Sequence, residues 1–173
     1  MWSETGSPRL LLYGEPYAHY SLQYRDTLSA PGWYATGITN LHNLDLCRNL
    51  QWLDLADNRV SDITPLATLT NLTYLSLDSN EITDIAPLAG LFNLDQLILT
   101  NSYDTDHPGN QIWNLEPLVT NAENGGLGSG DSVTLDSRTL TDPDTDEIPQ
   151  VIAAQLDLLV QHGVDVILTE ELN

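Results

Sequence analysis

One cysteine and four histidines are the residues of this 173-residue chain best suited to nucleophilic or metal chemistry. A catalytic cysteine must be accessible, and a neighbouring base or cation must lower its pKa. Cys47 lies 22 residues before Leu69 and occupies a leucine position of the repeat described below, so we expect a buried, inert thiol. The histidines share no predicted face: His19, His42, His107 and His162. We therefore expect no catalytic residues and a chain that is not an enzyme.

Two acidic segments contain residue types that bind metal ions. Asp104, Asp106 and His107 lie close together in the chain, but three candidates without a fourth ligand favour a solvated loop. The run Asp142-Pro-Asp-Thr-Asp146 has the spacing that opens a calcium loop. Its sixth position, which should be glycine, is Glu147, and its twelfth, which should be glutamate, is an alanine. We expect these acids to mark the start of a helix, and we expect no metal or other cofactor.

The charge of the chain narrows the possible partners. Twenty-five acidic residues face five arginines and no lysine, which gives a formal net charge of −20. Nucleic-acid binding needs clustered Lys and Arg, so it is excluded. The acidity suits a cationic partner, divalent ions or high salt, although solubility alone would also explain it. No apolar run approaches the roughly 18 residues of a membrane helix, and Met1 to Pro8 has no signal-peptide pattern.

Internal repetition decides the fold class, because the apolar positions recur every 22 residues. The first clear row is Leu50, Leu53, Leu55, Asn58, Val60, Ile63, Pro65, Leu66 and Leu69. The second row is Leu72, Leu75, Leu77, Asn80, Ile82, Ile85, Pro87, Leu88 and Leu91. A third row opens with Leu94, Leu97 and Leu99 and resumes after an insertion with Ile112, Leu115, Pro117 and Leu118. A degenerate earlier row consists of Leu28, Ile38, Leu41, Leu44 and Cys47.

The spacing within a row predicts one coil of a solenoid. In Leu-x-Leu both leucines leave a strand on the same side, toward the core, and the residue between them points outward. Asn58 and Asn80 follow the strands where the chain turns inward, and a side-chain amide there can satisfy backbone groups. The Ile-x-Pro-Leu segments suit a tight return without an α-helix, since proline disfavours one. A single coil cannot bury its own leucines, so neighbouring coils must stack.

These rows resemble the 22-residue leucine-rich repeats of bacterial internalins. The internalin pattern Leu-x-x-Leu-x-Leu-x-x-Asn-x-Ile-x-Asp-Ile-x-Pro-Leu is matched almost throughout residues 50–66 and 72–88. Residues 126–136, with Ile148-Pro149 and Gly163-Val164, look like the C-terminal cap of secreted members, although Arg138-Thr139 replaces its usual Asn-Pro pair. The resemblance implies an α/β solenoid with parallel strands on its concave face, an irregular or 3₁₀ convex side and a helix–strand cap. It also implies a non-enzymatic protein of the bacterial cell surface or extracellular space.

We expect three segments along the chain. Residues 1–27 form an N-terminal cap or flanking segment, read as either a helix or a strand that carries aromatic side chains. Residues 28–122 form the repeats, with an insertion at residues 103–111. Residues 123–173 form the C-terminal cap, with a helix from Asp142 to His162 that Gly163 ends, followed by a closing strand. The predicted buried face of that helix is Val151, Ile152, Leu156, Leu159 and Val160.

The repeat also predicts which side chains the concave face presents to a partner. The candidate binding residues are Tyr34, Trp52, Asp54, Tyr74, Ser76, Asp78, Gln96, Ile98 and Thr100. They include an aromatic column (Tyr34, Trp52 and Tyr74) beside an acidic one to which we also assign Asp136. Exposed Trp and Tyr are enriched at binding hot spots, and carboxylates beside them suit a basic protein, although a glycan could also stack there. We expect a monomeric binding module; the alternative is a structural spacer with no ligand of its own.

Overall fold

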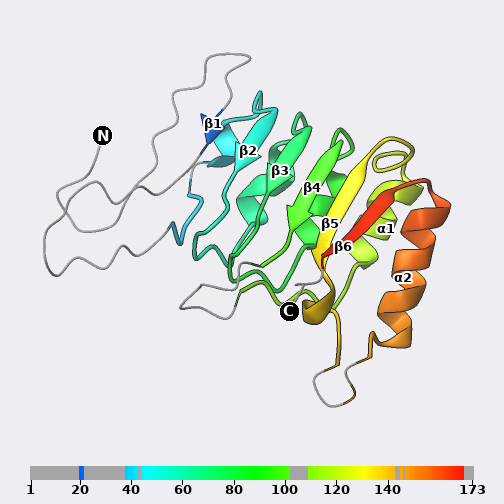
Figure 1. The fold of residues 1–173 in the computed structure, drawn as a ribbon. Coiled ribbons are helices and arrows are strands. Elements are labelled where there is room, and N and C mark those ends of the chain that lie inside the picture. Colours follow the sequence, from blue (N-terminus) through cyan, green and yellow to red (C-terminus); the bar gives the residue numbers. More distant parts are fainter. Residues whose placement is uncertain are drawn as a thin grey trace, which may run out of the picture.

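The computed structural model describes residues 20–21, 38–42, 44–101, 109–142, 145 and 147–169. Figure 1 shows a row of parallel strands in front, short helices behind the sheet and a longer helix beside the last strand. The strands pair in chain order: β1 (Tyr20–Ser21), β2 (Trp52–Asp54), β3 (Tyr74–Ser76), β4 (Gln96–Leu99), β5 (Ser132–Asp136) and β6 (Asp165–Thr169). The helices are η1 (Leu44–Leu46), η2 (Thr64–Thr68), η3 (Ala86–Gly90), α1 (Glu116–Glu123), η4 (Ser137–Thr139) and α2 (Gln150–Gln161). This architecture confirms the predicted α/β leucine-rich-repeat solenoid.

The inward-facing leucines of the strands form one side of the core, and the buried residues of the turns and short helices form the other. Leu53, Leu75 and Leu97 pair in register across β2, β3 and β4 and have no exposed surface. Leu99 and Leu135, which pair two residues further along β4 and β5, are also buried. Leu168 of β6, which pairs with Leu135, is 39% exposed. The leucine core therefore reaches the surface at the last strand.

Buried asparagines connect successive coils through their side-chain amides. Asn80 is fully buried; its Nδ2 donates to the backbone oxygens of Leu55 (2.8 Å) and Leu77 (3.1 Å), and its Oδ1 accepts the Val60 N–H (3.0 Å). Asn58 and Asn110 occupy the corresponding places in the coils on either side. Each amide thus satisfies polar groups that the turning chain would otherwise bury without partners.

Short 3₁₀ helices return the chain behind the sheet, as the Ile-x-Pro-Leu segments predict. η2 and η3 each carry proline in the first turn, and each begins after an aspartate. The Oδ1 atoms of Asp62 and Asp84 accept the backbone N–H two residues ahead, both at 2.9 Å. Asn114 does the same in the third coil, where the return is the eight-residue α-helix α1. The repeated acidic position is therefore a turn former.

The end of α1 leaves no room for a side chain at the glycine that follows. The buried Asn121 side chain accepts the Leu127 N–H at 2.8 Å and donates to the Leu88 carbonyl at 3.1 Å. A Cβ at Gly126 would overlap this amide, whereas a Cβ at Gly90 would meet nothing within 4 Å.

The C-terminal cap differs from the prediction in where its helix begins. α2 begins at Gln150 after the N-cap Pro149, whereas Asp142 and Glu147 form an antiparallel bridge ahead of it, with the Asp142 N–H 2.8 Å from the Glu147 carbonyl oxygen. Because these two acids precede the helix by three or more residues, the helix dipole does not account for them. The helix ends, as predicted, before Gly163, which has a φ of +90°.

The buried face of α2 is also narrower than predicted. Ile152 and Leu159 are buried, but Val151 and Val160 are exposed. A glutamine completes the buried face: Gln155 Oε1 accepts the Leu115 N–H at 2.9 Å, which ties the cap to the start of α1. Apolar periodicity missed this position because a polar side chain fills it.

The N-terminal side of the sheet corrects the predicted repeat register. The strand beside β2 is β1, in which Tyr20 is the register partner of Leu53, whereas the predicted aromatic column placed Tyr34 in the coil beside Trp52. Tyr20 and Ser21 are the only members of the predicted 1–27 cap within the described residues, and they agree with the strand reading of that segment. In the degenerate row, Leu41 and Leu44 are buried, as expected.

Candidate functional site on the concave face

The residues that alternate with the core leucines form columns across the concave face, which we define as the sheet face opposite the helices. One column runs from Trp52 through Tyr74, Gln96 and Ser132 to Asp165, since these residues pair in register. The next column is Asp54, Ser76, Ile98, Thr134 and Ile167. A third set lies two residues beyond Ser76, Ile98 and Thr134 and consists of Asp78, Thr100 and Asp136. Eight of the nine predicted binding residues thus lie together; the ninth, Tyr34, lies outside the described residues.

Trp52 and Tyr74 form an aromatic stack. Their ring centroids are 3.6 Å apart and their planes are 7° from parallel, and the two residues are register partners on adjacent parallel strands. Trp52 remains 37% exposed, and Tyr74 is partly exposed. The stack holds both rings in one orientation, so little side-chain entropy remains to be lost when a partner binds.

The acidic residues of this face do not form the single column that we predicted. Asp54 belongs to the column of Ser76, whereas Asp78 and Asp136 lie two residues beyond that column along the chain. The grouping was wrong because residues two apart on a strand share a face but not a column. The column of Asp54 therefore lies between the column of the aromatic stack and the positions of Asp78 and Asp136.

Asp54 and Asp78 still act on the same phenol. Burial raises the pKa of Tyr74 above its usual value, and the nearby carboxylates of Asp54 and then Asp78 raise it further, against a hydrogen bond with Ser76. Negative charge next to the phenol disfavours its ionised form. The stack therefore lies in a negative potential.

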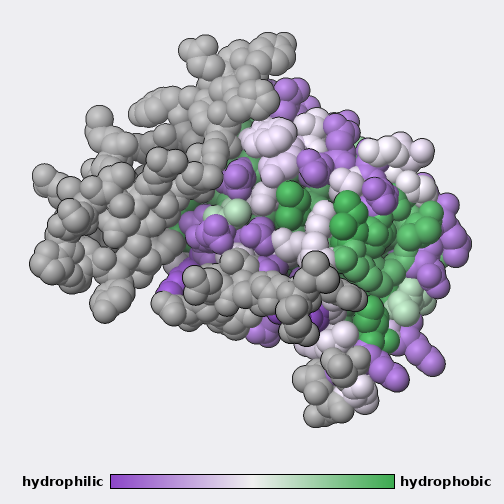
Figure 2. Space-filling view, viewed as in Figure 1, coloured by the Kyte–Doolittle hydropathy of each residue, from purple (hydrophilic) through white to green (hydrophobic). Residues whose placement is uncertain are grey.

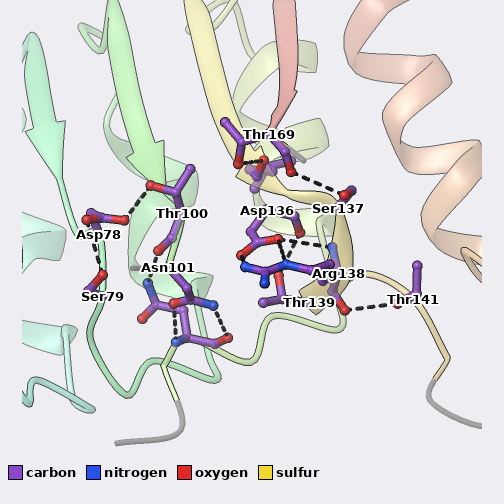
Figure 3. A network of polar contacts seen from close by, with 12 residues as sticks. Asp78, Ser79, Thr100, Asn101, Asp136, Ser137, Arg138, Thr139, Thr141 and Thr169 are labelled. Carbon is purple, nitrogen blue, oxygen red and sulfur yellow. Dashed lines mark hydrogen bonds and ion pairs between the residues drawn. The ribbon is translucent and has the colours of Figure 1, made fainter. Parts of the chain in front are cut away.

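A polar network follows the C-terminal ends of the strands (Figure 3). Asp78 accepts hydrogen bonds from the hydroxyls of Ser79 and Thr100. Asp136 is almost fully buried and is paired with Arg138, with Nη2 2.7 Å from Oδ2 and Nε 3.1 Å from Oδ1. Its carboxylate is therefore neutralised by a two-pronged arginine contact, whereas that of Asp78 accepts hydrogen bonds only from hydroxyl groups among the described residues.

The remaining predicted site residues differ in accessibility. Gln96 is exposed, Ile98 and Thr100 are partly exposed, and Ser76 is buried. The serine was predicted to be a contact residue from its outward position alone, but its side chain is buried and forms a hydrogen bond with Tyr74.

The metal candidates and the cysteine considered in the sequence can be compared with the part of the chain that the structure describes. Within those ranges, no three His, Cys, Asp or Glu side chains come together as a metal ion would require. Asp104, Asp106 and His107 lie outside the described residues. Cys47 is at the edge of the core and partly buried, less deeply than predicted. Burial, followed by the nearby Asp45, raises the pKa of its thiol, which is the opposite of what activates a nucleophile.

Comparison with known proteins supports the repeat reading. A family model for leucine-rich repeats in two copies matches residues 48–90. The solved structure of internalin C2 from Listeria monocytogenes aligns with 78% of this chain at 29% sequence identity and a TM-score of 0.53. The chain therefore contains leucine-rich repeats and folds as a solenoid similar to that of internalin C2. An internalin F structure from the same organism aligns with 78% of the chain at 20% identity and a TM-score of 0.44.

The chain spans only part of these relatives, covering 48% of internalin C2 and 40% of internalin F. No curated protein matches it in sequence. In the described part of the chain, no helix is both long and apolar enough to cross a bilayer.

Two exposed apolar features of this solenoid lie outside the set of predicted binding residues. Ile167 and Leu168 of β6 are exposed at the last strand, where Figure 2 shows apolar surface beside a more polar region. Trp113 is 47% exposed and stands where the two preceding coils have Ser61 and Thr83. Comparing every position of the three rows, instead of the strand positions alone, would have identified this tryptophan from the sequence.

Proposed function

We propose that this solenoid is a protein-binding module that recognises its ligand on the concave face, with Trp52 and Tyr74 as the principal contact residues. Leucine-rich repeats are a protein-interaction architecture, and the family match extends over both coils that carry the two rings. The stacked, accessible Trp52–Tyr74 pair is the single observation that carries the proposal. Large aromatic side chains held in place contribute most of the binding energy at many interfaces.

A protein ligand fits this surface better than a glycan does. The negative potential around Tyr74 favours a charged partner over a neutral sugar. The module has no catalytic role in this proposal, and it acts at the bacterial surface or outside the cell, as the internalin neighbours suggest.

The test compares the wild-type chain with a Trp52→Ala/Tyr74→Ala variant on a protein array and a glycan array. A matched control, Phe92→Ala/Trp113→Ala, removes two exposed aromatic rings away from the concave face. Truncating a hot-spot residue costs about 2 kcal/mol or more, which corresponds to roughly a 30-fold weaker Kd. We expect that loss for the first variant and an unchanged Kd for the control, with identical circular dichroism.

Two results would contradict the proposal. A protein ligand that binds the Trp52/Tyr74 variant as tightly as the wild type would place recognition elsewhere on the solenoid. The absence of any ligand on either array would favour the spacer alternative, in which the repeats only separate other parts of a longer protein. Detection of the native protein in the culture medium or on intact cells, against a cytoplasmic marker, tests the proposed location.

A further inference from the structure

A carboxylate with an open oxygen lies beside the aromatic stack. Asp54 and Trp52 are two residues apart on β2 and share the concave face, so their Cα atoms are about 7 Å apart. Asp54 Oδ1 accepts the Ala56 N–H at 3.0 Å, and Oδ2 receives no hydrogen bond from any described residue. The side chain is partly exposed, so Oδ2 is available to a ligand.

No cation of the described chain balances this charge. The one ion pair among the described residues joins Arg138 to Asp136, and Asp78 receives only hydroxyl hydrogen bonds. Asp54 lies two residues beyond Trp52 and Asp78 four residues beyond Tyr74, and both charges act on the Tyr74 phenol of the stack. A positive group bound there would meet two carboxylates and an aromatic surface at once.

Among the described residues, the concave face already contains one arginine–carboxylate contact, which Asp54 and Asp78 lack. Arg138 binds Asp136 through two nitrogen atoms, and Asp136 and Asp78 are equivalent positions of their coils, two residues beyond Thr134 and Ser76. A guanidinium can fork onto a carboxylate and at the same time lie flat against an aromatic ring, because it is planar. An ammonium group is a strongly hydrated point charge that offers neither geometry.

We infer that the concave face recognises an arginine side chain of its protein partner, which packs against the Trp52–Tyr74 stack and donates hydrogen bonds to Asp54. This inference rests on the proposed function and names the chemistry of the partner. Asp54 is the hydrogen-bond acceptor, the rings provide cation–π contact, and Asp78 strengthens the negative potential without direct contact. The charge of the whole chain, −20, draws a basic partner toward the site before contact.

The probe is a glycine–serine peptide with one central arginine, together with two variants in which citrulline or lysine replaces the arginine. Citrulline keeps the planar shape but is neutral, and lysine keeps the charge but is not planar. Binding is followed at low salt by NMR through the indole N–H signal of Trp52, which the Trp52→Phe variant assigns. We expect saturable shifts with the arginine peptide, a Kd at least about threefold weaker with lysine, and none with citrulline.

The Asp54→Asn variant removes the charge but keeps an oxygen that can accept the Ala56 N–H. We expect its Kd for the arginine peptide to be about threefold weaker or more. Asp62→Asn is the matched control: it removes the same charge at η2, and its amide oxygen can still accept the Thr64 N–H. The control should bind the arginine peptide as the wild type does.

Equal binding of the arginine and citrulline peptides, or no difference between Asp54→Asn and Asp62→Asn, would overturn the inference. That result would leave the proposed function intact if an array partner still required Trp52 and Tyr74. Conversely, Asp54-dependent binding of arginine, combined with an array partner indifferent to both rings, would refute the proposed function and retain the arginine site.

Discussion

Replacing Asn80 by alanine should destabilise the solenoid far more than the same change at an exposed asparagine. The Asn80 amide makes four backbone hydrogen bonds, but their loss is not equally severe. The Leu55 carbonyl also accepts from Asn58 at 2.9 Å, and the Leu77 carbonyl accepts from Asn110 at 2.8 Å. The neighbouring asparagines therefore keep both carbonyls satisfied.

Among the described residues, the Val60 N–H has no such second partner, since it donates to Asn80 Oδ1 alone. Leaving one buried donor unsatisfied costs about 1–3 kcal/mol, and each further hydrogen bond contributes about 1 kcal/mol at most when its carbonyl keeps another partner. We expect the free energy of unfolding to fall by about 2–4 kcal/mol. Asn71→Ala, which removes one exposed bond to the Arg48 carbonyl, should cost about 0.5 kcal/mol or less.

Urea denaturation followed by circular dichroism measures both variants against the wild type. The midpoint should fall for Asn80→Ala with an unchanged m-value, because the surface exposed on unfolding is the same. A difference of less than about 1 kcal/mol between the two variants would refute the reasoning. The asparagines would then occupy the repeat without connecting its coils.

Three further predictions concern the core, the turns and the site. Leu75→Ala removes a fully buried side chain and should lower the free energy of unfolding by about 2–5 kcal/mol in the same urea assay. Gly126→Ala should lower the melting temperature, because its methyl group would overlap a buried amide, whereas Gly90→Ala, which meets open space, should leave it unchanged or slightly higher. Asp54→Asn should bring the pKa of Tyr74 closer to its usual value of 10.0, as measured by NMR titration of the phenol; an unchanged pKa would mean that the two groups do not interact.

Periodicity predicted the repeats well because each coil solves the same packing problem. Leu53, Leu75 and Leu97 occupy one position in three coils, so an error in one row would have been exposed by the others. The same argument predicted the outward positions, including the Trp52–Tyr74 pair. It could not predict their stacking, which depends on side-chain torsions that the repeat does not specify.

The cap and the N-terminal strand lie where the repeat ends, and there the prediction was less accurate. The acids before α2 were assigned to the helix because the rule for helix starts is statistical, but the bridge between Asp142 and Glu147 uses backbone groups that any residue carries. Gln155 was missed because its burial depends on a hydrogen bond to Leu115, 40 residues earlier in the chain. Contacts of this length leave no local pattern in the sequence.

The asparagine that follows the insertion has a consequence for how such proteins diversify. Asn110 fills the slot of its coil 30 residues after Asn80, and Asn101 closes the junction by accepting the Asn110 N–H at 2.7 Å and donating to its carbonyl at 3.1 Å. The coil is thus complete on both sides of the junction, and the entropic cost of a longer connection grows only slowly with its length. The segment between Asn101 and Asn110 can therefore change in length or sequence during evolution without altering the register of the leucines. For the same reason, a peptide library can be inserted at this junction.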